Sequence, residues 1–485
     1  DNSMIHIYSL KILDIYIKKK KSMKFLGKII KNKGWVGKKY SLKDEMFDLL
    51  SLYSLNQNKY SYLLESSSRG NKKNRFSILF YKPIIKIKKT GCTNKNFLNN
   101  FDDLWKKQKI DQDYLYFEKK KIPFCGGWFV YLGYELAKEI EPSLQIPSSP
   151  FKLPTAFASR VSTAIIYDHI DNEIFIVSDD EEKFNSDLTD IEGDFCEVIE
   201  NKNSLSGEIK ILEKGSASEH QEQVRKCIDY IFQGEIFQAN LSRLWKFEID
   251  KNINEVEIYK QLRMKNPSPF AGLIKFEGSS IISSSPERLV SVDGNFLETR
   301  PIAGTRPRGS SALHDIELSK ELINSDKEKA EHLMLVDLER NDISKVCKAG
   351  SVEVNEMMTI ESYAHVHHIV SNIRGVKNDS VTPGMIISSL FPGGTITGCP
   401  KVRCMQILGE LEKVGRGPYT GSCGYITHGG NMDINILIRS MLKEDKFLYF
   451  RAGGGIVADS VPENETSETE AKANGMLKAL RSLKI

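Results

Sequence analysis

GLIKFEGSSIISSSPERLVSV, residues 272–292, holds three short apolar runs separated by Glu-Gly and Ser-Pro turn signals. Runs of this length and composition between such turns are typical of β-strands. A helical stretch, SDKEKAEHLMLVDLERND at residues 325–342, comes soon afterwards. Strands and helices mix in this way without the regular alternation of a doubly wound parallel sheet. The sequence therefore predicts an α+β protein built on large antiparallel sheets.

The chain has 485 residues, of which 40% are hydrophobic and 27% charged, so it can bury a sizeable core. Its formal net charge of +4 is too small to indicate a nucleic-acid-binding protein by itself. Eight cysteines are present and none forms a C-x-x-C pair, which argues against a zinc ribbon or a thioredoxin-type site. Scattered single cysteines are typical of a reduced, cytosolic protein, so we expect a cytoplasmic location.

Composition divides the chain into three parts. Residues 1–22 are apolar in places, but charges interrupt them, and they are too short and too polar to span a bilayer. With Met4 and Met23 both available as starts, we expect this part to be a disordered or non-native extension. Residues 23–200 hold strand-like runs, and residues 215–485 hold most segments that carry chemistry.

The helix expected at residues 325–342 carries an acidic residue close to its apolar side. Its predicted apolar stripe consists of Ala330, Leu333, Met334 and Leu338. Glu331 lies one position away from this stripe, so its carboxylate leans toward the interior, where it must be paired or bound to metal. On position alone, a salt bridge to a nearby lysine or arginine is the simpler interpretation.

A second acidic group follows three consecutive glycines near the end of the chain. Gly453, Gly454 and Gly455 allow backbone N–H groups to approach an anion, although a tight turn also explains them. Glu465, Glu468 and Glu470 then open the last helix, where acidic residues complement the helix dipole. Two carboxylates from separate helices would suit Mg²⁺, which binds one or two carboxylates and keeps waters for the substrate.

Other polar segments point to a small anionic substrate. SYAHVHHIVSNIRG, residues 362–375, reads as a strand in which His368 points away from His365 and His367. One partly buried histidine is favoured over a metal cluster. FPGGTITG, residues 391–398, is a turn rich in Gly and Thr, and GNMDINILIRS, residues 430–440, delivers Arg439, whose guanidinium suits a carboxylate. We expect a small polyanion with carboxylate groups; phosphate stays open at this point, although no P-loop or dinucleotide-binding fingerprint is present.

These segments together resemble the chorismate-utilising enzymes. The motifs that carry the resemblance occur in the family's order: SPERL (285–289), TRPIAGTRPRG (299–309), DKEKAEHLMLVDLERNDI (326–343), HVHHIVS (365–371), FPGGTITGCPKVR (391–403), GNMD (430–433) and AGGGIVADS (452–460). The resemblance covers about residues 215–485, and LLESSS (63–68) and PFCGGWFVYLGYEL (123–136) extend it into the first half. It implies one large sandwich of two antiparallel sheets with the active site between them.

The resemblance also implies roles for individual residues. Glu331 and Glu468 are similar to the family's Mg²⁺ ligands, which displaces the salt-bridge interpretation of Glu331. Glu287 resembles the general acid that protonates the departing ring hydroxyl, and His368 the active-site histidine. The groups that hold the two carboxylates of chorismate would be Thr395, Tyr419, Arg439 and the backbone of Gly453, Gly454 and Gly455. An acid and a bound Mg²⁺ both suit the loss of hydroxide from a ring.

Two positions indicate the nucleophile. Gln238 stands where isochorismate and salicylate synthases carry a lysine that activates water, and a glutamine cannot act as that base. The resemblance therefore points to the members that use ammonia, supplied here by a separate glutamine amidotransferase subunit. Many aminodeoxychorismate synthases carry a nucleophilic lysine in place of Ala303, and an alanine leaves room for ammonia itself.

Two products remain open. Ala303 favours anthranilate synthase component I, which makes anthranilate and pyruvate for tryptophan synthesis, and Glu65 and Ser66 of LLES resemble its tryptophan-binding effector motif. Asn240, Ala271 and the segments RNDI, VHHIVS and FPGGTITG resemble aminodeoxychorismate synthase component I, which makes 4-amino-4-deoxychorismate for 4-aminobenzoate and folate. We weigh these several positions above the single alanine and predict the aminodeoxychorismate product.

A function of another class is a non-catalytic protein that binds nucleic acid or acidic lipid through its basic N-terminal segment, residues 17–40. The lysines there have no aromatic residues interleaved in a recognisable reader motif, so a solvated basic face is the simpler interpretation. We therefore expect neither a nucleic-acid nor a membrane partner.

Overall fold

The computed structural model describes residues 29–32, 34–42, 47–67, 75–91, 96–110, 116–198, 207–362 and 366–483. The predicted extension at residues 1–22, both candidate start methionines and His365 lie outside these ranges. Most of the basic N-terminal segment lies outside them as well.

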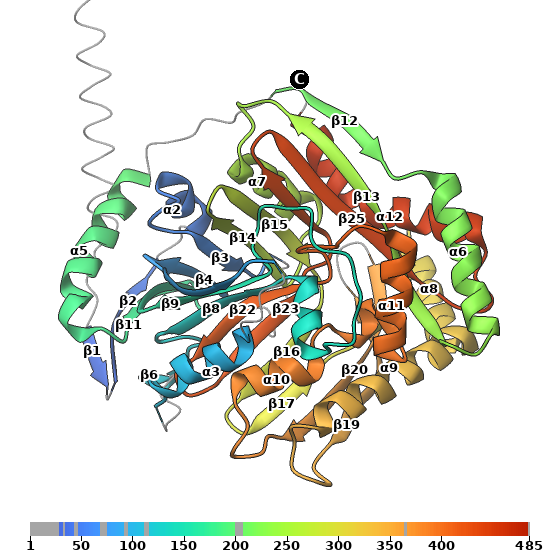
Figure 1. Cartoon of the computed structure of the whole chain (residues 1–485). Helices are drawn as coiled ribbons and strands as arrows, with labels where there is room; N and C mark the ends of the chain where they lie inside the picture. Colours follow the sequence, from blue (N-terminus) through green and yellow to red (C-terminus); the bar gives the residue numbers. More distant parts are fainter. Residues whose placement is uncertain are drawn as a thin grey trace, which may run out of the picture.

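Two antiparallel sheets form the body of the molecule (Figure 1). Within the described residues the larger sheet has 13 strands, with β21 beside β13. In spatial order its strands are β1 (Ile29–Asn32), β2 (Trp35–Ser41), β11 (Glu173–Ser178), β10 (Thr163–Asp168), β4 (Phe76–Tyr81), β3 (Tyr62–Glu65), β14 (Phe270–Phe276), β15 (Ser279–Ser285), β24 (Ser440–Glu444), β25 (Phe447–Ile456), β13 (Gln238–Ile249) and β12 (Ile209–Lys214), with β21 (Gly398–Cys399) at the side. Neighbouring strands run antiparallel throughout.

The second sheet has 10 strands in the part of the chain that the structure describes, and it is also antiparallel. Its order is β18 (Ile302–Pro307), β20 (Val366–Val376), β17 (Phe296–Thr299), β16 (Arg288–Asp293), β23 (Met432–Ile436), β22 (Ser422–Thr427), β8 (Gly127–Leu132), β9 (Ala156–Val161) and β5 (Ile84–Lys89), with β19 (Glu353–Ser362) beside β20. A separate hairpin joins β6 (Tyr116–Phe117) to β7 (Lys120–Lys121).

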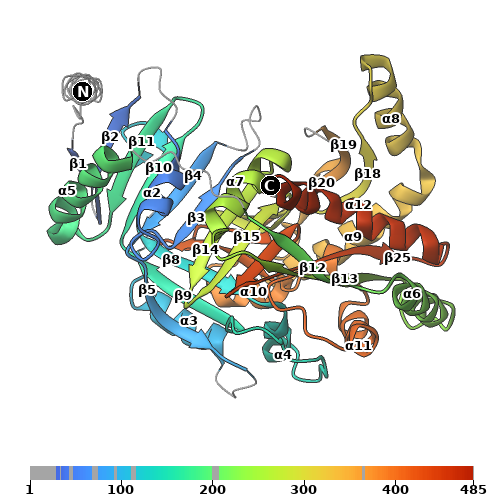
Figure 2. The same ribbon diagram turned by 90° about the horizontal axis from the view of Figure 1, so that it is seen from above.

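Helices cover the outer faces and the ends of the sheets. They are α2 (Leu49–Leu55), α3 (Phe97–Lys106), α4 (Ala137–Ile140), α5 (Glu181–Glu197), α6 (Ala217–Phe232), α7 (Glu255–Lys265), α8 (Ala312–Asn324), α9 (Asp326–Ser344), α10 (Pro383–Leu390), α11 (Lys401–Glu412) and α12 (Pro462–Arg481), with short 3₁₀ turns η1 (Tyr134–Leu136) and η3 (Gly394–Ile396). Figures 1 and 2 show α6, α8, α9, α11 and α12 grouped at the end of the molecule that holds β13 and β25, while α2 and α5 lie at the opposite end. The predicted α+β architecture of two antiparallel sheets is confirmed.

Both halves of the chain contribute strands to both sheets. In the larger sheet the halves meet where β3 pairs with β14, with Leu63 opposite Leu273. In the second sheet they meet where β8 pairs with β22, with Val130 opposite Gly424. The two regions therefore share one continuous pair of sheets.

The stretch GLIKFEGSSIISSSPERLVSV crosses from one sheet to the other. Its first two runs form the hairpin of β14 and β15, which turns at Glu277 and Gly278 with positive φ angles of 43° and 90°. Its third run forms β16 of the second sheet. The serines of β15 are buried and hydrogen-bonded, as between the hydroxyls of Ser283 and Ser440 at 2.7 Å. The crossing places Glu287 between the two sheets.

Aromatic side chains from the two sheets stack against each other in the core. Tyr62 of β3 lies over Phe129 of β8 with 4.1 Å between ring centroids. Phe276 of β14 lies over Phe157 of β9 at the same separation, 4.1 Å. These four side chains are buried, so the contacts combine a large apolar area with favourable ring geometry and join the sheets face to face.

Helix α9 differs from its sequence-based prediction. Ser325, rather than Asp326, caps it, with its hydroxyl accepting a hydrogen bond from the Glu328 backbone N–H. The buried side consists of His332, Leu335, Val336, Glu339, Asp342 and Ile343, whereas Leu333 of the predicted stripe is 46% exposed. The predicted stripe was wrong because half of the buried face is polar, so apolar periodicity alone could not locate it.

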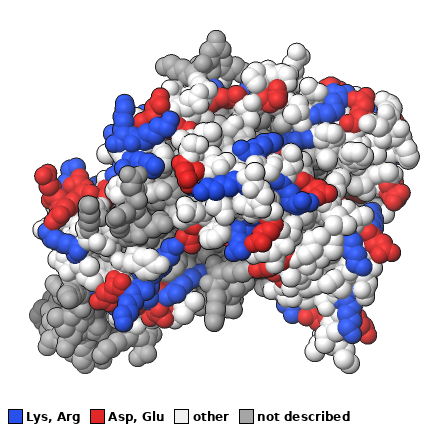
Figure 3. Space-filling model, turned by 90° about the horizontal axis from the view of Figure 1, so that it is seen from below, with Lys and Arg blue, Asp and Glu red and all other residues white. Residues whose placement is uncertain are grey.

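The charges on the surface are mixed. On the face shown in Figure 3, basic and acidic side chains stand beside one another over the described residues, without a continuous basic stripe of the kind that binds phosphates. None of the helices in the described ranges combines the length and apolar composition needed to cross a bilayer.

A buried charge network ties α11 to the β13–β25 pair. The Glu412 carboxylate accepts hydrogen bonds from the Ser242 backbone N–H at 2.9 Å and from Arg416 at 2.8 Å. It also pairs with Arg451 at 3.4 Å, and the side chains of Glu412, Arg416 and Arg451 are only 2%, 2% and 5% exposed.

Glu412→Ala should destabilise the fold by about 3–5 kcal/mol, because it leaves two arginines buried without their carboxylate. The free energy of unfolding in urea measures this effect. Glu410→Ala, on the same helix with a side chain that is 54% exposed, is the matched control and should change stability by less than about 0.5 kcal/mol. Equal effects of the two substitutions would contradict the buried-network interpretation.

Candidate active site

The three glycines Gly453–Gly455 lie inside strand β25 rather than in a tight turn, and β13 pairs with them. A Cβ atom on Gly455 would lie 2.1 Å from the Gln238 side-chain nitrogen, and one on Gly453 would lie 2.8 Å from the Tyr419 hydroxyl. A Cβ on Gly454 would lie 3.2 Å from a Glu468 oxygen. The glycines therefore allow functional side chains to lie directly against the strand.

Gln238 of β13 and Glu331 of α9 meet beside Gly455 of β25. The Gln238 side-chain N–H donates to the Glu331 carboxylate at 2.6 Å, and Gln238 is only 4% exposed. Burial raises the pKa of Glu331, the charge of Glu328 raises it further, and the Gln238 hydrogen bond partly opposes the shift. The carboxylate is thus held by a neutral amide, not by the lysine or arginine that its position alone suggested.

The first turns of α12 supply the second acidic group. Glu465 accepts a hydrogen bond from the Ser460 hydroxyl at 2.6 Å, and Glu468 pairs with Lys472 at 2.7 Å. Burial raises the pKa of Glu465, and the neighbouring Glu468 adds to this. Lys472 and Lys327 act electrostatically on both Glu465 and Glu331, so the acidic ends of α9 and α12 face each other.

This donor set suits a hard divalent cation. Glu331 and Glu468 offer only oxygen atoms, the donors that a hard cation prefers, and their carboxylates lie against the adjacent glycines Gly455 and Gly454 of β25. Glu331 and Glu468 do not belong to any group of three ligand atoms that lie within 4.8 Å of one another in the described ranges. Within the described ranges, the group of three ligand atoms that lies within 4.8 Å is Asp168, Asp171 and Glu173. That group already binds Lys120, at 2.9 Å from Asp168.

Glu287 is a buried acid at the crossing between the sheets. It is 5% exposed, and its carboxylate accepts a hydrogen bond from the Thr395 hydroxyl at 2.7 Å. Burial raises the pKa of Glu287 to about 7, with Glu339 adding to the rise and Thr395 and Arg439 opposing it. A carboxyl with this pKa can give up a proton near neutral pH.

Glu339 is a site residue that the sequence reasoning missed. Its carboxylate accepts from the Gly394 backbone N–H at 3.2 Å and from the Thr299 hydroxyl at 2.9 Å, and it is 4% exposed. It therefore holds the η3 turn that carries Thr395. Its spacing of eight residues from Glu331 on one helix was a signal that acidic side chains line this side of α9.

His368 and Ala303 lie on neighbouring strands β20 and β18. The His368 Nδ1 lies 3.1 Å from the Gly304 carbonyl oxygen, which can only accept, and also 3.1 Å from the Thr305 hydroxyl, which can donate or accept. Burial and then the charge of Arg439 lower the pKa of His368 to about 4, so the ring is neutral at neutral pH. His367 points to Asp315 instead, 2.8 Å away, as the alternation of the strand predicts. Ala303 is 7% exposed.

The remaining site residues join these groups. Arg439 has a positive φ of 51°, and its positive charge is close enough to lower the pKa values of both Glu287 and His368. Tyr419 is buried, and burial raises its pKa to about 12. The Asn240 side-chain N–H points to the Thr395 carbonyl oxygen at 3.5 Å and links the β13 side to the Glu287 side. The structure thus brings the residues predicted for catalysis, substrate binding and Mg²⁺ into one region.

The comparisons with known proteins agree with this geometry. The family model described as chorismate binding enzyme matches residues 60–478. The chain belongs to the chorismate-binding enzymes. An anthranilate synthase component I-like protein from Synechocystis is 40% identical over 366 residues, 75% of this chain and 74% of that protein. Aminodeoxychorismate synthase component 1 from Bacillus subtilis is 36% identical over 466 residues, which are 92% of this chain and 96% of that protein.

Among solved structures, anthranilate synthase component I from Streptococcus pneumoniae superposes with a TM-score of 0.73 at 30% identity. The match covers 83% of this chain and 92% of the solved one. The recognition of the chorismate-utilising family and of its fold is therefore confirmed, and the relatives include proteins named anthranilate synthase component 1 and aminodeoxychorismate synthase component 1.

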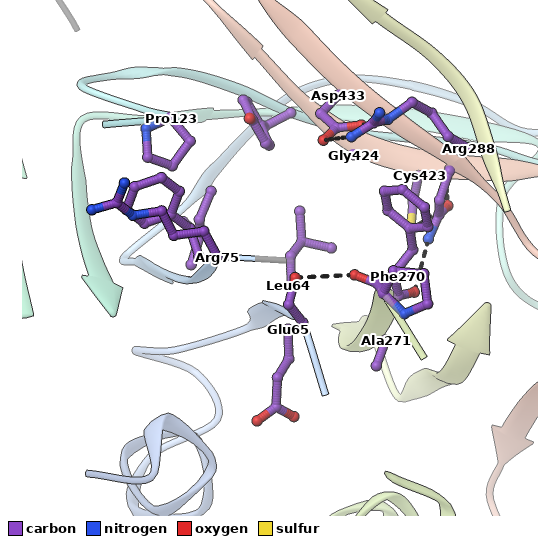
Figure 4. Close-up of a pocket in the computed structure, with 16 residues that line it drawn as sticks. Leu64, Glu65, Arg75, Pro123, Phe270, Ala271, Arg288, Cys423, Gly424 and Asp433 are labelled. Carbon is purple, nitrogen blue, oxygen red and sulfur yellow. Dashed lines mark hydrogen bonds and ion pairs between the residues drawn. The ribbon is translucent and has the colours of Figure 1, made fainter. Parts of the chain in front are cut away.

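The predicted effector residues of this chorismate-binding enzyme lie apart from that region. Glu65 and Ser66 line a cavity of about 120 Å³ between the two sheets, together with Phe270, Ala271 and Arg288 (Figure 4). Figure 4 shows the Glu65 carboxylate pointing away from the other lining residues. It accepts hydrogen bonds from the Tyr259 hydroxyl at 2.6 Å and from Arg263 at 2.9 Å. Glu65 therefore supports the wall of the cavity, and an effector there remains a prediction.

Proposed function

We propose that this chorismate-binding enzyme aminates chorismate with ammonia in a Mg²⁺-dependent reaction and forms 4-amino-4-deoxychorismate. The observation that carries the proposal is the buried Gln238 amide bound to Glu331 at 2.6 Å. An amide cannot take a proton from water, so water attack would lack its base. Neutral ammonia needs no such base because it is a nucleophile as it stands.

In the proposed reaction Glu287 is the general acid. The carbon–nitrogen bond forms as the ring carbon–oxygen bond breaks, and the Glu287 proton goes to the departing hydroxyl, which leaves as water. The new amine carries the positive charge until it releases a proton, and Glu287 is then protonated again. Thr395 and Arg439 stabilise the ionised Glu287 formed in between, since both act to lower its pKa.

Glu331 and Glu468 would hold Mg²⁺, which when bound neutralises a substrate carboxylate. The substrate carboxylates would be bound by Arg439, the Tyr419 hydroxyl and the backbone N–H groups of Gly453–Gly455, with Thr395 next to the acid. Arginine and preorganised N–H groups are suited to carboxylates. The neutral His368 would accept or donate a hydrogen bond beside the ring without adding charge.

Ala303 supports direct attack by ammonia. Its methyl group occupies the place where a lysine would otherwise supply a covalent amine, so no enzyme-bound intermediate is required. The ammonia would come from a separate glutamine amidotransferase subunit, in agreement with the names of the relatives as component I or 1 of a synthase.

A second candidate is anthranilate formation. Specific observations favour it: Ala303 itself, and relatives named anthranilate synthase component 1, such as that of Acetivibrio thermocellus at 36% identity over 446 residues. The para product is preferred because Asn240, a position where anthranilate synthases usually carry an apolar residue, faces Thr395 in the site.

Incubation of the purified chain with chorismate, Mg²⁺ and an ammonium salt tests the product. We expect aminodeoxychorismate, seen as 4-aminobenzoate only after a lyase is added. Anthranilate formed without a lyase would replace the first candidate by the second. Isochorismate without any aminated product would contradict both.

The pH dependence tests the acid. Because the pKa of Glu287 is about 7, kcat/KM for chorismate should fall above pH 7, by up to about tenfold per unit. Thr395→Val removes a hydrogen-bond donor that lowers the pKa of Glu287, so the pH above which kcat/KM falls should become higher. Thr395→Ser keeps the hydroxyl and should leave this pH unchanged. An unchanged or lower pH for the fall in Thr395→Val would argue against Glu287 as the acid.

Removal of the metal ligand tests the Mg²⁺ proposal. Glu331→Ala should weaken Mg²⁺ binding, measured by titration calorimetry, and lower turnover by more than the roughly 10- to 100-fold typical of an outer-shell partner. Asp337→Ala, on the same helix with a side chain that is 72% exposed, is the control and should leave both unchanged. Unaltered Mg²⁺ affinity in Glu331→Ala would mean that the ion is held elsewhere.

A further inference from the structure

Two side-chain amides of β13 have oxygen atoms that no described donor reaches. The Gln238 Oε1 and the Asn240 Oδ1 are both buried and lack a hydrogen-bond partner among the residues that the structure describes. Buried carbonyl oxygens of this kind are normally satisfied, so an unmatched pair calls for an explanation.

Gln238 and Asn240 share one face of the strand. Residues two apart on a strand point the same way, and Ala239 and Leu241 between and after them pack into a separate apolar cluster. The nitrogen ends of the two amides are already engaged, Gln238 with Glu331 at 2.6 Å and Asn240 with the Thr395 carbonyl at 3.5 Å. The oxygen ends are therefore what this face offers to a ligand between the Glu331 side and the Thr395 side.

The chemistry of the two oxygens selects the ligand. They are acceptors without a proton, so they cannot bind a substrate carboxylate, which also only accepts. Ammonia has three N–H groups and one lone pair. Two acceptors can therefore hold it by N–H while the lone pair stays directed at the ring. A water molecule held in the same place would have no base to take its proton.

We propose that Gln238 Oε1 and Asn240 Oδ1 form the subsite that holds and orients ammonia, with Asn240 as a positioning residue for the nucleophile. The inference rests on the proposed use of ammonia and does not depend on which ring carbon is attacked. It assigns Asn240 a contact with the nucleophile, not with chorismate.

The test is the KM for ammonium at fixed pH and saturating Mg²⁺. Asn240→Leu has nearly the same shape without an acceptor, and it should raise the KM for ammonium about tenfold, the factor implied by one ordinary hydrogen bond. The KM for chorismate should stay within about twofold. Asn240→Asp keeps an acceptor at the same place and should hold the KM for ammonium at or below the wild-type value.

A matched control is Asn372→Leu, which removes a buried amide of β20 that bonds Asn355 at 2.8 Å outside the site. It should leave the KM for ammonium unchanged. An unchanged KM for ammonium in Asn240→Leu, or an equal rise in Asn240→Asp, would overturn the inference. A rise in the KM for chorismate that matches the rise for ammonium would overturn it too, since Asn240 would then contact a chorismate hydroxyl.

The product assay on the unaltered protein separates this inference from the proposed function. Anthranilate as the product, with the ammonium effect of Asn240→Leu intact, would overturn the proposed product and support the subsite. Aminodeoxychorismate as the product without that effect would overturn the subsite alone. Absence of any ammonium-dependent turnover would overturn both.

Discussion

The ladder between β13 and β25 is the contact on which the rest of the site depends. It pairs Asn240 with Gly455 and continues to Glu248 and Phe447, so the two strands cannot slip without exposing one buried face. Because three consecutive residues of β25 have no side chain, the amide of Gln238 and the acids of two helices approach the same short stretch of backbone. The Glu412 network fixes this ladder from the α11 side.

Buried acids in this protein fall into two kinds, set by their partners. Burial acts to raise the pKa of Glu412, but Arg416 and Arg451 hold it below its usual value, so this carboxylate is a permanent structural charge. Glu287 and Glu331 have mainly neutral donors, Thr395 and Gln238, and their pKa values are raised. A neutral donor orients a carboxylate without fully offsetting its desolvation, so the acid keeps a proton or a cation within reach.

Strand-forming runs and turn residues act locally, so they predicted an α+β protein with large antiparallel sheets. The family resemblance of the ordered motifs then implied the two-sheet sandwich. The residues predicted for catalysis, substrate binding and Mg²⁺ lie together, and the predicted effector residues Glu65 and Ser66 lie apart from them; the chemical roles given to all of them stay predictions. The prediction of the buried face of α9 was wrong, and Glu339 was missed, because this helix packs polar residues against the η3 turn and β20. Apolar periodicity cannot reveal a buried side made of His, Glu and Asp.

The sequence by itself determined the α+β class, the strand-forming runs of residues 272–292, and the presence of an amide at Gln238 instead of a base. These follow from side-chain chemistry and short-range turn geometry. Only the tertiary structure decided that Glu287 lies at the crossing between the sheets, that Glu65 turns toward Tyr259 and Arg263, and that the oxygens of Gln238 and Asn240 lack a donor among the described residues. Burial and hydrogen-bond partners come from strands far apart in the chain, so no local pattern could have set them.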